Sequence, residues 1–219
     1  MQHMDLTDFP RPSVAVDVVV LTVVDDGLYV VTVDSPFGTA LPGTFLHEGE
    51  RLHDAAARAL SAKAGIEGLD FHQVGMFDDP RRDDRGWVLS MAHVAAVAFD
   101  SLPDVGLVAV ESGSPTEGLA FDHSEMVVRA LHDLQATYAD HADPGFLLGD
   151  AFTLLQLRRL YEAIYDRELP KDTFRRQVID GLVGTGETTS AGGGRPAELY
   201  ERKPDAQLPR TAAALFRGP

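Results

Sequence analysis

The chain has 219 residues, of which 44% are hydrophobic and 24% are charged, and it contains no cysteine. These values are typical of a soluble globular protein with one large or two small domains, and they exclude disulfide scaffolds, cysteine zinc sites and thiol nucleophiles. Its apolar runs are far shorter than the ~20 residues of a membrane-spanning helix, and the start of the chain carries acids where an export signal carries bases. We therefore expect a cytoplasmic protein without a membrane partner.

Charge is unevenly distributed along the chain. Residues 1–149 contain 8 Lys and Arg against 24 Asp and Glu, a net charge of −16, whereas residues 150–219 contain 11 against 10, a net charge of +1. Such asymmetry between two parts of a chain is a signal of separate domains. The acidic part repels DNA, while the arginine-rich part can meet phosphate. A neutral surface domain explains the count of the second part equally well.

The first elements form a predicted hairpin and a helix. Two valine-rich runs, residues 14–24 and 28–33, flank the turn signal Asp25-Asp26-Gly27 and predict two antiparallel strands. Residues 51–64 are helix formers with apolar side chains at helical spacing, and Gly65 follows them as a typical end signal.

Further strands and a second helix complete the acidic part. The β-rich runs 71–77 and 87–99 are separated by a charged loop, and residues 107–110 are a short strand candidate. Residues 122–138 carry apolar side chains at helical spacing and predict a helix with one buried side. Strands surrounding two helices indicate an α/β or α+β body.

The segment His141–Gly145 is rich in turn residues and marks the expected boundary between a domain of residues 1–148 and a domain of residues 149–219. Thr153 and Gln156 have the spacing of a capping box before a helical pattern, and Pro170 opens a second short helix. A short β run and a glycine-rich stretch follow. Two helices and a hairpin with a glycine-rich tip are the outline of a winged helix-turn-helix.

One motif stands out in the acidic part. The stretch Leu41-Pro-Gly-Thr-Phe-Leu-His-Glu-Gly-Glu50, followed by a helix with Arg58 and by Gly65-Ile66, resembles a Nudix box. In that pattern a glycine is followed after five residues by a glutamate, and after seven more by Arg-Glu-apolar-x-Glu-Glu-x-Gly-apolar. Glu50, Arg58, Leu60 and Gly65-Ile66 match it.

The mismatches fall on the positions that carry the chemistry. Thr44 replaces the glycine, while Ala59, Ala62 and Lys63 replace the three remaining glutamates. These three positions are related as i, i+3 and i+4 and share one helix face, where carboxylates would hold Mg²⁺ against a diphosphate. Two methyl groups and an ammonium group cannot do so, and Glu50 alone offers few oxygens. The resemblance therefore implies a Nudix fold, a mixed sheet between helices, without hydrolysis, metal or cofactor.

An alternative interpretation is that the chain is an active enzyme. The acidic residues of the charged loop can build a different metal site, which would make the chain an active hydrolase of nucleoside-diphosphate derivatives with an accessory C-terminal domain. A solvated acidic loop explains the same residues. They are Asp78, Asp79, Asp83 and Asp84.

A Nudix body without its glutamates, followed by a winged helix, resembles the Nudix-related transcriptional regulators of the NrtR type. Supporting stretches are residues 79–90, 119–125, 152–161, 174–178 and 194–197. The family consists of bacterial regulators, usually dimeric, in which the Nudix domain senses a metabolite such as ADP-ribose. The resemblance implies a ligand-responsive homodimer that binds double-stranded DNA at a palindromic operator, with ADP-ribose as the leading candidate effector.

Candidate effector-binding residues lie in and beside the box. Three of the eight basic residues of the acidic part are arginines of the charged loop, and guanidinium groups suit a diphosphate, although salt bridges to the neighbouring aspartates compete. Lys63 can take over the counter-charge of the lost metal, and Phe37 can stack on an adenine. The predicted set is Lys63, Arg81, Arg82, Arg85, Glu50 and Phe37.

Candidate DNA-binding residues lie in the helix after Pro170. Phe174 and Val178 are expected to face the core, which turns their polar neighbours outward to base edges and phosphates. A solvated basic helix is the competing interpretation, and the wing arginine can instead pair with Glu198. The predicted set is Lys171, Thr173, Arg175, Arg176, Gln177 and Arg195.

Overall fold

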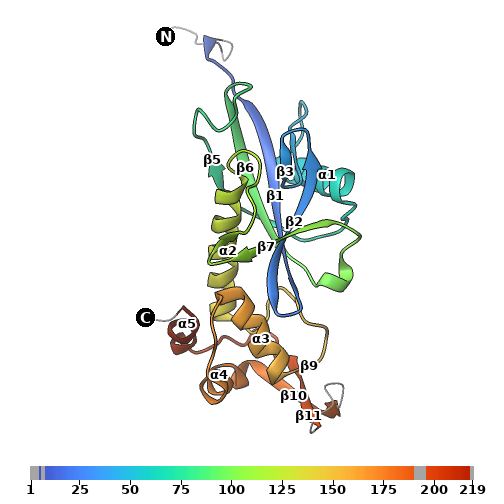
Figure 1. The fold of residues 1–219 in the computed structure, drawn as a ribbon, viewed down its shortest axis with the longest axis vertical. Coiled ribbons are helices and arrows are strands. Elements are labelled where there is room, and N and C mark those ends of the chain that lie inside the picture. The colour runs from blue at the N-terminus through green and yellow to red at the C-terminus, as the bar shows by residue number, and fades with distance from the viewer. Residues whose placement is uncertain (1–4, 6–7, 190–195, 218–219) are drawn as a thin grey trace.

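A computed structural model describes residue 5, residues 8–189 and residues 196–217 (Figure 1). A mixed β-sheet occupies one part of the molecule, and a smaller unit of helices and three short strands lies at one end of it. None of the helices in the described part of the chain combines the length and the apolar character that a membrane span needs.

The large sheet has the strand order β5-β6-β1-β2-β7-β8, with β3 added to β2 and β4 added to β1. Strands β1 and β6 are parallel, and the other pairs are antiparallel. The predicted hairpin is confirmed, with Asp25 and Asp26 in left-handed conformation at its turn. The strands are β1 (Ser13–Val24), β2 (Gly27–Ser35), β3 (Gly38–Ala40), β4 (Gly43–Phe45), β5 (His72–Phe77), β6 (Val88–Ala96), β7 (Gly106–Glu111) and β8 (Ser114–Pro115).

Two helices cover the two faces of this sheet. Alternating side chains of β1 point to opposite faces, so Val16 and Val18 pack with helix α1 (Leu52–Ala64) while Val19 and Leu21 pack with helix α2 (His123–Asp140). Both helices begin and end within a few residues of the predicted bounds. A one-turn 3₁₀ helix, η2 (Phe99–Ser101), ends the predicted strand 87–99 early.

The smaller unit has the topology of a winged helix. Helix α3 (Leu154–Tyr165) starts at a complete capping box of Thr153 and Gln156, and helix α4 (Lys171–Val178) follows Pro170, as predicted. The hairpin of β10 (Leu182–Thr189) and β11 (Ala197–Arg202) pairs with β9 (Phe152–Thr153), a strand too short for the sequence pattern to indicate. The turn η3 (Ile179–Gly181) joins α4 to the hairpin.

A last helix, α5 (Arg210–Arg217), was not predicted. It turns back and packs on both α2 and α4 (Figure 1). Ala212 and Phe216 are buried, and the ring of Phe216 lies among the aromatic side chains of α3 and α4. Because of this return, one hydrophobic core continues from the large sheet through α2 into the winged helix.

The segment expected to separate the domains is tightly ordered. Asp143 is completely buried, and its carboxylate accepts hydrogen bonds from the hydroxyl of Tyr138 and from two backbone N–H groups, of Leu147 and Leu148. Arg202, at the end of β11, pairs with the same carboxylate and also donates to the Asp143 carbonyl at 2.9 Å. A buried ion pair therefore joins the wing to this segment.

Candidate effector pocket and DNA-binding face

A cavity of about 280 Å³ opens where β1, β4, the charged loop and the start of α2 meet. Four of the six predicted effector-binding residues line it, and they come from three separate segments. They are Phe37, Lys63, Arg82 and Arg85. The sequence prediction thus identified residues that the fold brings together from up to 48 positions apart.

The other two predicted residues do not line this cavity. Glu50 forms a two-pronged ion pair with Arg58, with both nitrogen–oxygen distances at 2.8 Å, and it also accepts from the backbone N–H of His47. The hydrogen bond from Arg58 lowers the pKa of Glu50 to about 2. Arg81 is 90% exposed and lies beside Asp79.

Arg82 is buried in the wall of the pocket and is held by carboxylates. Its guanidinium binds both oxygens of Asp122 at 2.8 and 2.6 Å, and Asp17 lies 3.8 Å away. The competing interpretation of salt bridges therefore applies to this residue. Its positive charge adds to the electrostatic potential of the pocket, but the two N–H groups that bind Asp122 are not available to a ligand.

Arg85 lies at the mouth of the pocket among aromatic rings. Its guanidinium carbon is 4.6 Å from the ring centre of Phe37, 5.3 Å from that of Phe121 and 5.5 Å from that of Phe45. It also binds buried Asp83 through two hydrogen bonds, and its side chain is 45% exposed. A planar surface of guanidinium and aromatic rings of this kind suits stacking by a flat ligand group.

The floor of the pocket is polar, and sequence reasoning missed it. Asp17 accepts a hydrogen bond from the Ser90 hydroxyl at 2.6 Å and lies 3.4 Å from Nε2 of His123. Burial raises the pKa of Asp17, but the hydrogen bonds from His123 and Ser90 outweigh it, so the pKa lies below its ordinary value. A Cβ at Gly43 would stand 1.8 Å from an Asp17 oxygen. An aspartate within a valine-rich strand was the available signal.

The three altered box positions differ in their surroundings. Ala59 is buried against the sheet, whereas Ala62 and Lys63 are exposed. Because α1 is helical over all three positions, their predicted i, i+3 and i+4 relation holds, but they differ in exposure.

Several side chains of the charged loop bind other residues of the same loop. Asp83 is held by Arg85, and the Asp79 carboxylate accepts the backbone N–H of Arg81 at 2.8 Å. Within the residues that the structure describes, no group of three or more His, Asp or Glu is placed to hold a metal ion.

Helix α4 exposes most of its predicted DNA-binding residues. Phe174 and Val178 are buried, as expected, and Lys171, Arg175 and Arg176 are exposed. Among the described residues, none of these three basic side chains has a carboxylate within 4 Å. Their charge is therefore available to a partner.

The other three predicted DNA-binding residues differ in their contacts. Thr173 accepts a hydrogen bond from Arg176 at 3.3 Å. Gln177 is half-buried, and its side-chain oxygen accepts a 2.7 Å hydrogen bond from Thr211 of α5. One of the two lone pairs of this oxygen is thus used inside the protein, which ties the Gln177 amide to α5. Arg195 lies outside the described residues.

Comparisons with known proteins identify the family. Residues 144–201 match the NrtR DNA-binding winged helix domain. An ADPR responsive transcriptional repressor, NtrR, of Acinetobacter baylyi is 30% identical over 209 residues, which cover 89% of this chain and 83% of that protein. This chain belongs to the NrtR family.

Solved structures agree with this membership. The crystal structure of Shewanella oneidensis NrtR complexed with a 27mer DNA is similar with a TM-score of 0.73 and 29% identity, covering 92% of this chain and 96% of that one. A MutT/nudix family protein from Enterococcus faecalis shares the fold, with a TM-score of 0.73 and 22% identity over 91% of this chain and 90% of that one. The predicted fold class, a Nudix body followed by a winged helix, is confirmed.

Proposed function

We propose that this protein is a transcriptional regulator that binds double-stranded DNA through its winged helix and responds to a nucleotide-like metabolite bound in its Nudix body. ADP-ribose is the leading candidate effector, since the Acinetobacter relative is named for its response to this compound. The likeness to a DNA-bound relative over nearly the whole chain supports the DNA-binding part.

The observation that carries the proposal is the exposed basic face of α4. Lys171, Arg175 and Arg176 stand on an eight-residue helix in a part of the chain whose net charge is +1, next to a body of net charge −16. Phosphate contacts supply most of the affinity of proteins for DNA, and the residues of a recognition helix read bases in the major groove. Free cations on such a helix suit both tasks.

The effector pocket can bind a phosphorylated ligand without a metal ion. Lys63 and Arg85 supply positive charge at its mouth, and the aromatic rings beside Arg85 offer a stacking surface. Three of the four box glutamates are absent, and the remaining one, Glu50, is neutralised by Arg58. We therefore propose that the Nudix body binds its ligand and does not hydrolyse it.

Helix α2 links the pocket to the DNA-binding part. Its first residue, His123, lines the pocket, and its last residue, Asp140, accepts a 2.7 Å hydrogen bond from the backbone of Leu208 just before α5. The 18 residues of the helix span roughly 27 Å. A ligand that prefers one position of α2 would shift α5 and, through Thr211 and Gln177, the recognition helix.

We further propose two functional domains, residues 1–148 and 149–219, and a homodimer on a palindromic operator. One short recognition helix reads only a few base pairs, so adequate specificity requires two half-sites about one or two helical turns apart, ~34 Å each. Light scattering of the free protein and of its complex with a palindromic duplex tests this; a monomer in both states contradicts it.

The experiment that tests the regulator against the hydrolase uses one preparation for two assays. Fluorescence anisotropy measures binding to palindromic duplexes from the region upstream of the gene, with and without ADP-ribose and with EDTA present. Chromatography measures turnover of ADP-ribose to AMP and ribose 5-phosphate with Mg²⁺ or Mn²⁺. Salt-sensitive DNA binding that ADP-ribose alters, without turnover, supports the proposal. Robust metal-dependent turnover that Glu50→Gln abolishes contradicts it.

A further inference from the structure

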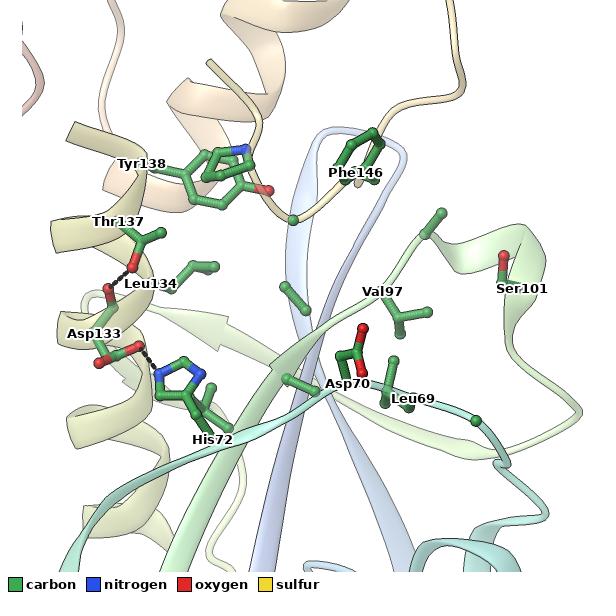
Figure 2. A pocket seen from close by; sticks show the side chains of 17 residues that line it. Leu69, Asp70, His72, Val97, Ser101, Asp133, Leu134, Thr137, Tyr138 and Phe146 are labelled. Carbon is green, nitrogen blue, oxygen red and sulfur yellow. Dashed lines mark hydrogen bonds and ion pairs between the residues drawn. The ribbon is translucent and has the colours of Figure 1, made fainter. Parts of the chain in front are cut away.

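A second cavity, of about 550 Å³, lies where the Nudix body meets the winged helix (Figure 2). Its walls are the chain leading into β5, the end of β6 with the turn η2, the second half of α2, and residues 144–146 of the connecting segment. It shares no lining residue with the effector pocket. Its volume lies within the range of small-molecule sites, ~300–1,000 Å³.

The lining combines an apolar surface with carboxylates. Leu69, Val97 and Leu134 line it, and Phe146, at its upper rim in Figure 2, is 63% exposed. An aromatic ring that remains this exposed beside a cavity is a surface on which a flat ligand can stack.

The charge of the lining is negative. Asp133 on α2 binds His72 at 2.8 Å, whereas the exposed carboxylate of Asp70 has no partner within the part of the chain that the structure describes. None of the described lining residues is a lysine or an arginine. In the effector pocket three basic residues outnumber the two lining carboxylates of Asp17 and Asp83, whereas this cavity has two carboxylates and no Lys or Arg in its lining, so it attracts cations.

We propose that this cavity is a second ligand site, which takes a small planar organic cation. The cationic group of the ligand lies at Asp70, and its ring lies against Phe146 and the apolar wall formed by Val97 and Leu134. A phosphorylated ligand is repelled here, so the two sites accept ligands of opposite charge. Occupancy of this site does not require the proposed effector or DNA.

The site lies beside the contacts that join the winged helix to the Nudix body. Phe146 stacks on the guanidinium of Arg202, whose carbon lies 4.5 Å from the ring centre, and Arg202 donates to the backbone carbonyls of Asp143 and Leu148. Tyr138, another lining residue, donates to the Asp143 carboxylate at 2.8 Å. Tyr138 itself is fully buried, so a ligand acts through Phe146, and by holding this ring on Arg202 it stabilises the contacts that hold the wing on the Nudix body.

Benzamidine, a planar aromatic cation, is a suitable probe, and benzoate is its anion of matched shape. The full-length protein, without DNA, is titrated with each compound, and backbone amide shifts in ¹H–¹⁵N spectra report binding. We expect saturable shifts from benzamidine at residues 69–72, 133–138 and 144–146, and none from benzoate. Equal binding of both compounds, or shifts confined to the effector pocket, overturns the proposal.

Two substitutions test which groups of the cavity bind the ligand. Asp70→Asn weakens benzamidine binding about fivefold, the effect of losing one partly exposed charge pair of ~1 kcal/mol, whereas Asp104→Asn, at an exposed loop elsewhere, leaves it unchanged. Phe146→Leu also weakens benzamidine binding, while Phe9→Leu, at an exposed aromatic residue outside the cavity lining, does not. If the Asp70→Asn and Asp104→Asn variants bind benzamidine equally well, the site does not select cations. ADP-ribose and DNA binding, measured in parallel, test the proposed function separately.

Discussion

Three arginines of the Nudix body and two arginines of helix α4 are in opposite environments. In the body, Arg58, Arg82 and Arg85 each face a carboxylate with two nitrogen–oxygen contacts of 2.6–2.9 Å. On α4, Arg175 and Arg176 are exposed and have no carboxylate within 4 Å among the described residues. A basic cluster in a sequence thus indicates available charge only where the fold places no carboxylate beside it, because a nearby carboxylate competes with any external anion.

The largest expected effect is on stability and concerns Arg202, which is paired with Asp143 where the wing meets the connecting segment. Arg202→Ala leaves the carboxylate of Asp143 buried without its counter-charge, so we expect the free energy of unfolding to fall by about 3–5 kcal/mol. Urea denaturation measures it. Arg81→Ala, at a 90% exposed side chain, is the control and should change stability by less than ~0.5 kcal/mol. Similar losses in both variants would remove the distinction between held and exposed arginines.

An exposed arginine should show the reverse behaviour. Arg176→Ala is expected to weaken operator binding by about 1–3 kcal/mol and to leave unfolding by urea almost unchanged, because its only described contact is with Thr173. Fluorescence anisotropy at several salt concentrations measures affinity and salt dependence together. Arg81→Ala serves again as the control. Unchanged DNA affinity in Arg176→Ala would make α4 a solvated helix.

Lys63 is an exposed cation of the Nudix body that lines the effector pocket. Lys63→Glu should weaken ADP-ribose binding about tenfold, or ~1.4 kcal/mol, since a charged donor at the pocket becomes a repelling carboxylate. Calorimetry with EDTA present measures it. Arg51→Glu makes the same change of charge at an exposed position outside the pocket lining and should have little effect. DNA binding without effector should stay the same in both variants; an equal loss there would contradict separate sites.

The smallest effect is expected at the ion pair of Glu50 and Arg58. The pKa of Glu50 is lowered from 4.5 to about 2 in the folded chain, so the pair stabilises the fold fully above pH 4.5 and loses its effect as the pH falls toward 2. Glu50→Gln should therefore differ from the wild type in urea midpoint near neutral pH, and this difference should shrink below pH 4.5. Glu48→Gln, at an exposed glutamate, is the control. A pH-independent difference would argue against the ion pair.

Local sequence patterns determined most of the secondary structure. The valine-rich hairpin, the helices α1 to α4, the capping box at Thr153 and the order of a Nudix body before a winged helix could be predicted, because they depend on periodicity and turn residues within short windows. The degenerate box was likewise visible in the sequence. Its spacing is local, and helix geometry relates its residues directly.

Only the tertiary structure decided which of the candidate residues are available. Whether Arg82 and Arg85 face a ligand or a carboxylate depends on Asp122 and Asp83, and the return of α5 to α4 placed Thr211 on Gln177. The pocket floor at Asp17 and His123 joins residues more than a hundred positions apart. Such pairs form because packing of the sheet against α2 brings distant strands and helices together, and no pattern within a short window of sequence encodes that distance.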